Sequence, residues 1–402
     1  MDFWQSRAER CIAQEGALTN SKRPSCMVRG AYPTHFSSGH GPHLRTPGGQ
    51  SYLDYICALG TCILGYSDDY VNTAIRKGAA SGILFSLAST HEVEFAEKIK
   101  EIFPFIEKIK ILKSGSEGCA AALTIARAYQ RTKNNRSVVL SAGYHGYTNE
   151  FTSLKPPAHG VVVDFPIATL RDFGQLSDPN IAAVIVEPVE LDCSDARKDW
   201  LLELRSLCDK FGILLIFDET ITALRVPGLS VASMFGITPD LFVAGKALAN
   251  GMPISIVGGK AEIMESCEYF ISTTFAGEIL TFNAALATIN VMQNSHMELW
   301  ETGLYFAEKF NSLAPEIVKL EGYATRGTFI GDPYKKALFF QEACNRRILF
   351  GPSWFIGLSH TKDIIDVTIS ECKKIMNDIK KYKVELYGEI PKSPFSEKIR
   401  GR

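Results

Sequence analysis

Runs of consecutive apolar residues alternate with segments of helical periodicity from about residue 50 to residue 296. The strand-like runs occupy residues 51–56, 108–113, 137–141, 161–163, 182–186, 213–217 and 241–244. Apolar residues recur at helical spacing in residues 91–103, 117–131, 200–211 and 282–293. Continuous apolar strands are typical of sheets buried on both faces, and helices lie between them here. The pattern therefore predicts an α/β fold with a mostly parallel sheet covered by helices on both sides.

The two ends of the chain have a different pattern. Residues 1–50 are rich in Gly, Pro, His and Ser, and Gly48, Gly49 and Gln50 form a turn before the first strand. After about residue 297, two amphipathic helices and shorter strands follow, with the last helix expected at about 363–386. Because 402 residues exceed what one compact core usually holds, we expect two domains, or one large domain with a smaller appendage.

Composition and charge exclude several classes of partner. Hydrophobic residues make up 46% of the chain and charged residues 22%, with a net charge of −1, so no broad attraction to nucleic acid or to anionic membranes is expected. The ten cysteines are scattered without metal-ligand spacing, as is typical of reduced thiols in a cytosolic protein. The start of the chain has no signal-peptide order, and no apolar stretch approaches membrane-spanning length. We expect a cytoplasmic protein.

The most specific chemistry lies at two strand ends. Asp218 follows the apolar run 213–217, and Lys246 comes two residues after the run 241–244. Both are therefore expected at the carboxyl ends of buried strands, where open α/β sheets bind ligands. A lysine can form a Schiff base with a carbonyl cofactor, and a nearby aspartate can keep a pyridine nitrogen protonated. The pair predicts a site for pyridoxal 5'-phosphate (PLP).

Each of these two residues also has a simpler interpretation. The simpler interpretation of Lys246 is a lysine in a surface loop. The small residues around it, Gly245 and residues 251–253, argue against this interpretation. Asp218 needs a cationic partner in so apolar a run, and Arg225 or Arg127 would serve as well as a pyridinium nitrogen.

A phosphate site is predicted between a strand and an alanine-rich helix. Ser114, Gly115 and Ser116 precede the expected helix, whose amides and dipole favour an anion. The alternative is an ordinary helix start, with Ser116 as the cap and Glu117 satisfying the first turn. A second phosphate contact is suggested by the hydroxyls and glycine of residues 272–277.

Two further motifs end apolar runs. Tyr144 and His145 lie between glycines after the run 137–141, so the tyrosine ring can stack on a planar cofactor. The simpler interpretation is a turn with an incidental tyrosine and a solvated histidine. Glu187 follows the run 182–186 and either acts in the site, by orienting a neighbouring group or binding the surroundings of the cofactor ring, or forms a structural ion pair.

Taken in order, these motifs resemble the class III, fold type I PLP enzymes, most closely the glutamate-1-semialdehyde aminomutase group. The resemblance covers residues 29–368 and rests on residues 112–118, 126–129, 144–146, 185–189, 216–219, 236–241, 245–253 and 274–277. It implies a large domain with a mostly parallel seven-stranded sheet over 51–296. It also implies a smaller α+β domain built from 1–50 and 297–402.

The resemblance implies a role for each matched residue. Lys246 binds the cofactor aldehyde and moves the proton between the substrate α-carbon and cofactor C4′. Asp218 keeps the ring nitrogen protonated, and Tyr144 stacks on the ring. Thr274 reaches the phosphate in the neighbouring subunit, which implies a homodimer, and Arg29 pairs with a substrate carboxylate. The implied cofactor contacts are Ser114, Gly115, Ser116, Tyr144, His145, Glu187, Asp218, Lys246 and Thr274.

The chain also departs from the aminomutase pattern. Val163 follows Tyr147 by about sixteen positions, whereas a long lid is expected there to retain the released intermediate. Leu59 replaces a tryptophan of the substrate pocket, Ile356 stands where an acidic residue is expected, and Asp192 replaces an asparagine.

Without a lid an intermediate can leave, which suits transfer between two substrates. We therefore predict a ping-pong aminotransferase. An amino donor such as glutamate converts PLP to pyridoxamine phosphate (PMP), and a keto or aldehyde acceptor then takes the amine. The alternatives are an aminomutase, a racemase or epimerase on the same scaffold, and a non-catalytic binding or assembly protein.

Overall fold

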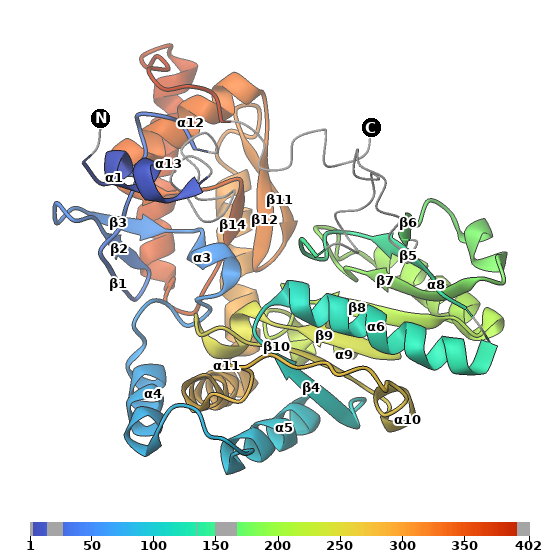
Figure 1. Ribbon diagram of the computed structural model, residues 1–402. Coiled ribbons are helices and arrows are strands. Elements are labelled where there is room, and N and C mark those ends of the chain that lie inside the picture. The colour runs from blue at the N-terminus through green and yellow to red at the C-terminus, as the bar shows by residue number, and fades with distance from the viewer. Residues whose placement is uncertain (1–2, 14–26, 135, 149–166, 392–402) are drawn as a thin grey trace. The chain divides into compact units, whose positions relative to one another are not determined.

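The computed structural model describes residues 3–13, 27–134, 136–148 and 167–391 (Figure 1). The chain divides into a central unit, residues 69–297, and a terminal unit made of residues 1–68 and 298–402. Our predicted boundary at residue 50 differs from this division. Residues 51–68 belong to the terminal unit, because the strand they begin with pairs with strands of that unit.

The central unit is built on a seven-stranded sheet with the order β4-β10-β9-β8-β7-β5-β6. Its strands are β4 (Lys108–Leu112), β5 (Val138–Ala142), β6 (Ile167–Thr169), β7 (Ile181–Val186), β8 (Leu214–Glu219), β9 (Leu241–Ala244) and β10 (Ser255–Gly259). Strands β9, β8, β7, β5 and β6 pair in parallel, and β10 is antiparallel to both of its neighbours. The predicted mostly parallel seven-stranded sheet is confirmed.

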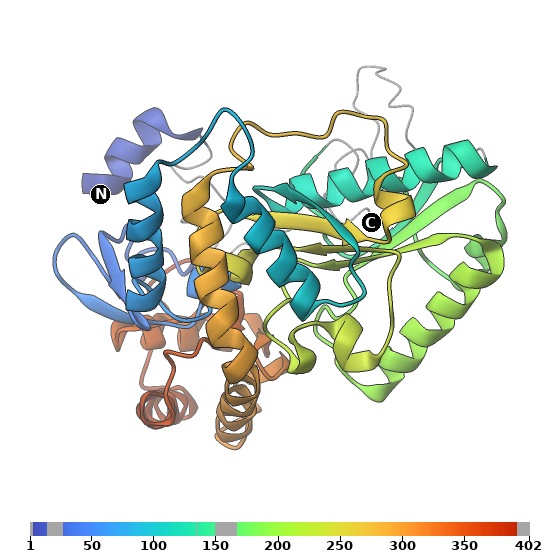
Figure 2. The same cartoon turned by 90° about the horizontal axis from the view of Figure 1, so that it is seen from below.

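Helices lie on both faces of this sheet (Figure 2). The longer helices of the central unit are α4 (Asp69–Ser81), α5 (Thr90–Ile102), α6 (Gly115–Asn134), α8 (Asp195–Phe211) and α11 (Ile279–Asn311), which continues past residue 297. Short helices are α9 (Val231–Phe235), α10 (Ala261–Met264), η3 (Phe173–Ser177), η4 (Pro227–Leu229) and η5 (Lys246–Ala249). The alanine-rich face of α6 packs against Ile185, Ile216 and Val243 in the core. Small side chains on α6 allow this close approach, and burial of each large strand residue contributes about 1.5–3 kcal/mol.

The terminal unit contains two small sheets, β1-β2-β3-β13 and β11-β12-β14. Their strands are β1 (Ser38–His40), β2 (His43–Arg45), β3 (Ser51–Asp54), β11 (Lys319–Tyr323), β12 (Arg326–Ile330), β13 (Ile348–Leu349) and β14 (Ser353–Phe355). The helices are α1 (Phe3–Cys11), α3 (Cys57–Gly60), α12 (Pro333–Asn345) and α13 (Lys362–Lys380). Strand β3 pairs in parallel with β13, Leu53 opposite Ile348. Segments from the two ends of the sequence thus form one sheet.

Leu59, the residue in place of the expected tryptophan, lies in an unusual turn. Cys57, Ala58 and Leu59 all have positive φ, a conformation costly for residues with a Cβ. The Asp54 carboxylate accepts hydrogen bonds from the Ile56 and Cys57 amides and from the Tyr66 hydroxyl, which holds the turn. Burial raises the pKa of Asp54 to about 6, although these hydrogen bonds oppose the shift.

Several elements differ from the sequence prediction. The expected strand at 161–163 lies outside the described residues. Strands β6 and β10 and helix α4 were not predicted, and the last helix ends at Lys380 instead of near residue 386. Among the described helices, none combines the length and the apolar character that crossing a membrane requires.

Candidate active site

Asp218 and Lys246 lie at the same edge of the central sheet. Asp218 is the last residue but one of β8, opposite Val243 of β9, and Lys246 begins η5 two residues after β9 ends. Lys246 is half-buried and has a φ of 42°. A non-glycine residue in this left-handed region is strained, and such strain is concentrated at functional sites.

The Asp218 carboxylate is buried and accepts four hydrogen bonds. Oδ1 accepts from the Thr220 amide at 3.0 Å and from the Thr220 hydroxyl at 2.5 Å. Oδ2 accepts from His145 Nδ1 at 2.8 Å and from Cys119 Sγ at 3.1 Å. Burial raises the pKa of Asp218, but His145, Thr220 and Cys119 together outweigh burial and hold it below its usual value.

His145 is the ionisable partner of Asp218. From the sequence we expected this partner to be a pyridinium nitrogen or an arginine. The His145 ring is 3% exposed, so the alternative of a solvated histidine is wrong. The other ring nitrogen, Nε2, lies 3.2 Å from the Ala142 carbonyl oxygen. Both ring nitrogens thus lie within hydrogen-bond distance of an oxygen atom, and the two contacts hold the ring in one orientation beside Asp218.

Glu187 orients the turn that contains Tyr144. The Tyr144 amide donates to Glu187 Oε1 at 2.7 Å, and a Cβ on Gly143 would lie 2.9 Å from the same oxygen. The main chain at Glu187 is itself held, because the Arg197 guanidinium donates to the carbonyl oxygens of Glu187 and Pro188. This supports the first of our two interpretations of Glu187. The Tyr144 side chain is half-exposed.

The start of α6 is capped by Ser114 and not by Ser116. The Glu117 amide donates to Ser114 Oγ at 3.3 Å, and Glu117 Oε2 accepts from the amide and hydroxyl of Ser114 at 2.7 and 3.0 Å. Our alternative interpretation named the wrong cap. Since Ser114 is engaged with Glu117, the groups left for an anion are the Ser116 hydroxyl and the first-turn amides of Gly115 and Ser116, which have no acceptor within the helix.

Three glycines bring these segments together. A Cβ on Gly146 would lie 2.3 Å from Ser116 Oγ, so the turn after β5 packs on the start of α6. A Cβ on Gly115 would lie 2.8 Å from Thr220 Cγ2, and one on Gly245 would lie 3.5 Å from the same atom. The phosphate-loop candidate, the Asp218 strand and the Lys246 segment therefore meet around Thr220.

A partly buried ion pair lies next to this loop. Lys113 Nζ lies 2.8 Å from Glu278 Oε1 and 3.3 Å from the Thr281 hydroxyl. Lys113 immediately precedes Ser114, and Glu278 immediately precedes α11. The pair thus joins the end of β4 to the start of α11.

The other predicted site residues lie elsewhere. Thr274 is exposed in the turn before α11. Arg29 belongs to the terminal unit, where its guanidinium lies 3.9 Å from the Glu389 carboxylate. Ile356 is fully buried in that unit, and Asp192 accepts from the Ser194 amide before α8. The short segment between Tyr147 and Val163 is described only as far as Thr148.

The described residues fit PLP. A carboxylate with a lowered pKa stays ionised and so favours a cationic ring nitrogen, and the adjacent strand β9 is followed two residues later by Lys246. First-turn amides beside a serine hydroxyl suit a phosphate, and a side chain at Gly146 would collide with that hydroxyl.

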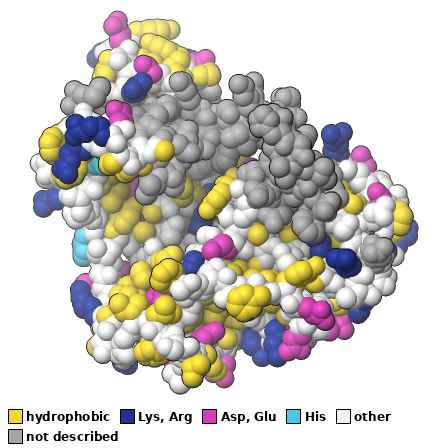
Figure 3. Space-filling view, in the orientation of Figure 1, with side chains coloured by type: hydrophobic (Ala, Val, Ile, Leu, Met, Phe, Trp, Pro, Cys, Tyr) yellow, Lys and Arg dark blue, Asp and Glu magenta, His cyan; other side chains and the backbone are white. Residues whose placement is uncertain are grey.

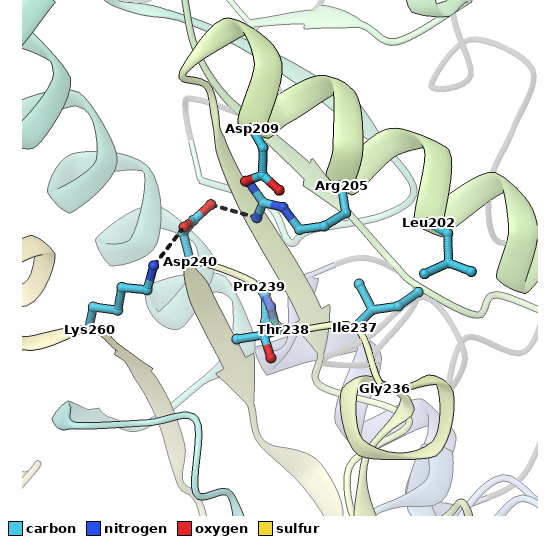
Figure 4. A pocket seen from close by; sticks show the side chains of 9 residues that line it. All are labelled: Leu202, Arg205, Asp209, Gly236, Ile237, Thr238, Pro239, Asp240 and Lys260. Carbon is cyan, nitrogen blue, oxygen red and sulfur yellow. Dashed lines mark hydrogen bonds and ion pairs between the residues drawn. The ribbon is translucent and has the colours of Figure 1, made fainter.

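A hollow of about 270 Å³ lies at the opposite end of the strands (Figure 4). Asp240, which immediately precedes β9, accepts from Arg205 at 2.7 Å, and Lys260 lies 4.0 Å away. Open α/β sheets bind ligands at the carboxyl ends of their strands, so this hollow is not the candidate active site.

Sequence reasoning missed Cys119. Its thiol, His145 Nδ1 and Asp218 Oδ2 lie within 4.8 Å of one another, close enough to hold a metal ion. Cys119 and Asp218 are 99 positions apart, and no motif or spacing links them. We expected only an alanine-rich helix in this part of the chain.

Comparisons with known proteins agree with this geometry. Residues 28–337 match the family described as aminotransferase class-III. A glutamate-1-semialdehyde 2,1-aminomutase of Chloroherpeton thalassium is 33% identical over 76% of this chain and 76% of its own length. A protein of the same name from Acetivibrio thermocellus is 30% identical over 85% of this chain and 90% of its own.

The solved structures add the fold. The FumI protein of Sphingopyxis sp. MTA144, in its PLP internal aldimine form, has a TM-score of 0.85 at 22% identity. The alignment covers 96% of this chain and 98% of that protein. At this identity the likeness supports the fold alone, which is that of fold type I PLP enzymes.

Proposed function

The chain belongs to the class III aminotransferase family of PLP-dependent enzymes, and from this premise we propose that it transfers an amino group between two separate substrates. An amino acid such as glutamate is the donor, and a keto or aldehyde compound is the acceptor. The observation that carries the chemistry is the Asp218 carboxylate, held ionised beside the strand that leads to Lys246.

Lys246 is the residue that would hold the cofactor. When bound, PLP supplies an aldehyde that accepts the amino group and a ring that delocalises the charge developing on the substrate α-carbon. The Lys246 amine would take the proton from the substrate α-carbon on Nζ and return it to C4′ of the cofactor.

Asp218 would keep the ring nitrogen protonated. Its own pKa is held low by His145 and Thr220 against the effect of burial, so the carboxylate stays charged at neutral pH. A buried carboxylate stabilises a cation beside it more strongly than an exposed one does, because water screens the charges less.

The cofactor would be positioned by groups around Asp218. The amides of Gly115 and Ser116, with the Ser116 hydroxyl, would bind the phosphate at the amino end of α6. Tyr144 would stack on the ring, in the direction set by Glu187. His145 would act through Asp218, and Ser114 through the cap of α6.

The proposed aminotransferase must release its first product, whereas the main alternative, an aminomutase, must retain its intermediate. The relatives named glutamate-1-semialdehyde 2,1-aminomutase favour intramolecular transfer as the second candidate. The short sequence between Tyr147 and Val163 favours two substrates, because it leaves little chain to close over an intermediate.

The assembly would be a homodimer, in line with a family that is typically dimeric and acts on small molecules. Apolar side chains are exposed around the α4–α5 connection (Figure 3), with Leu87 85% exposed, and Phe275 beside Thr274 is 64% exposed. Patches of this kind mark protein interfaces. A second copy that covers them would bring Thr274 to the neighbouring phosphate, and Arg29 would bind a substrate carboxylate.

The test isolates the two half-reactions. PLP-loaded protein is mixed with glutamate alone, and 2-oxoglutarate and PMP are quantified, with Lys246→Ala as the control. We expect one equivalent of each product per site in the wild type and none in the variant. If glutamate yields neither product, and glutamate-1-semialdehyde supplied alone is isomerised without exchange with added intermediate, the aminomutase alternative is correct.

A further inference from the structure

The four hydrogen bonds to Asp218 occupy every usual acceptor position of its carboxylate. A carboxylate offers about four such positions, two on each oxygen. Here Thr220 fills both on Oδ1, and His145 and Cys119 fill those on Oδ2. A cationic ring nitrogen that pairs with Asp218 must therefore displace one of the present donors.

The four donors differ in how readily they leave. The Thr220 amide is fixed in the backbone two residues away, and its hydroxyl makes the shortest of the four contacts, at 2.5 Å. His145 is held from its other side by the Ala142 carbonyl. The Cys119 contact is the longest, at 3.1 Å, and a thiol is the weakest donor among these groups.

We propose that Cys119 is the exchangeable donor of Asp218, a positioning residue whose S–H group holds the place that a protonated ring nitrogen takes when PLP binds. This inference rests on the proposed function. In the structure the thiol donates to the fourth acceptor position of the carboxylate of Asp218, a residue that is 5% exposed. It gives that position up only to a stronger donor.

The thiol remains a donor throughout. Burial raises the pKa of Cys119 well above its usual value, and the negative charge of Asp218 adds to the effect. After displacement, rotation about χ1 turns the S–H group toward the carbonyl of Gly115, four residues earlier on the same helix. Cys11 already makes such a bond in this chain, to the Arg7 carbonyl oxygen at 3.2 Å.

The exchange is tested first by infrared spectroscopy. The S–H stretching band of Cys119 is assigned as the band lost in Cys119→Ala, in buffer with a chelator that removes adventitious metal ions. We expect a hydrogen-bonded band in the cofactor-free protein that shifts when PLP is added. An analogue with carbon in place of the ring nitrogen should bind without that shift.

Two variants should change PLP affinity in opposite directions. Cys119→Ser places a stronger donor on Asp218, so the Kd for PLP should rise about fivefold, the effect of roughly one hydrogen bond. Cys119→Ala removes the competing donor, so the Kd should stay the same or fall. Cys208, buried on α8 away from Asp218, provides matched controls. Cys208→Ser and Cys208→Ala should leave the Kd unchanged.

Each contrary result is informative. If wild-type protein binds PLP but the S–H band does not move, or if both Cys119 variants weaken binding, the exchange is wrong while the proposed function stands. If the carbon analogue also shifts the band, the thiol responds to filling of the site and not to the nitrogen, and the proposal fails. If wild-type protein binds no PLP, both conclusions fall together.

Discussion

Two aspartates at opposite ends of neighbouring strands are neutralised in different ways. Asp240, before β9, is paired with the guanidinium of Arg205 and also accepts from the Leu215 amide at 2.8 Å. Asp218, at the end of β8, is held by a hydroxyl, an amide, an imidazole and a thiol. A guanidinium is permanently charged and ties α8 to the sheet, so Asp240 has no charge to offer. The donors of Asp218 are weaker, and its charge remains available to a bound cation.

The largest expected effect comes from removing each carboxylate in turn. Asp218→Asn should lower amino transfer by about 100-fold or more, since it removes the charge that holds the ring proton. Asp240→Asn should leave turnover per folded molecule within about twofold and cost about 2–3 kcal/mol of stability. Turnover at saturating PLP and urea unfolding measure the two quantities. Equal losses of turnover in the two variants would contradict the claim that Asp218 is functional and Asp240 is structural.

Replacing His145 should raise the lowered pKa of Asp218 toward its usual value. His145→Gln keeps a hydrogen-bond donor but removes the imidazole, whose hydrogen bond and electrostatic effect lower the pKa of Asp218, so that pKa should rise. In the wild type, the stability from Asp218 is present above its unfolded pKa of 3.8 and is lost as pH falls through the lower folded value. The acid limb of kcat/KM should therefore move to higher pH in the variant, with about a tenfold loss of activity near neutrality. His296→Gln in α11 is the matched control, and an unmoved acid limb would contradict the role of His145.

Glu219, next to Asp218, is also buried, but its pKa is shifted in the opposite direction. Burial raises the pKa of Glu219 to about 7, against hydrogen bonds from the amides of Val231 and Ala232. A raised acid pKa contributes stability at low pH that is lost as pH rises from about 4.5 through 7. Glu219→Gln does not titrate, so its stability relative to wild type should change by on the order of 3 kcal/mol across this window. Urea unfolding at pH 5 and pH 8 measures it, and parallel pH curves would contradict it.

The smallest expected effects come from replacing the two serines at the start of α6, one of which caps the helix while the other is proposed to bind the phosphate. Ser114→Ala should cost about 1 kcal/mol of stability, the usual value of a cap, and leave the Kd for PLP within about twofold. Ser116→Ala should do the reverse, with little loss of stability and a Kd about fivefold higher. Weaker PLP binding in Ser114→Ala alone would show that the cap serine itself binds the phosphate.

The sequence was most informative where a buried run ends in a charged residue. The strands before Asp218 and Lys246 are found where they were predicted, because apolar residues on both faces leave few alternatives to a central strand. Strand β10 was missed because its run ends in Gly258 and Gly259 and looks like a turn. Those glycines are explained only by packing, since a Cβ on Gly258 would lie 2.8 Å from Ile106.

Three other features were not predicted. Two are contacts between segments far apart in the sequence, and the third is the cap of α6, which depends on neighbouring residues. Nothing in the sequence brings Cys119 to Asp218, because the contact depends on how α6 is rotated over the sheet. The cap was different, since Ser114 and Glu117 have the spacing of a capping box and were open to recognition. The boundary after residue 50 failed to include β3 in the terminal unit because its partner β13 lies almost 300 positions later.

That pairing of β3 with β13 has a consequence for the growing polypeptide on the ribosome. Residue 54 leaves the ribosome long before residue 348 is made, an interval of roughly 15 to 60 s at usual rates of elongation. During this time β3 lacks one of its two neighbours, and its buried residues Tyr52 and Leu53 are without their native cover. Holdase chaperones should therefore be most needed late in translation, and messages truncated before codon 348 should yield insoluble chains even though the central unit is already complete.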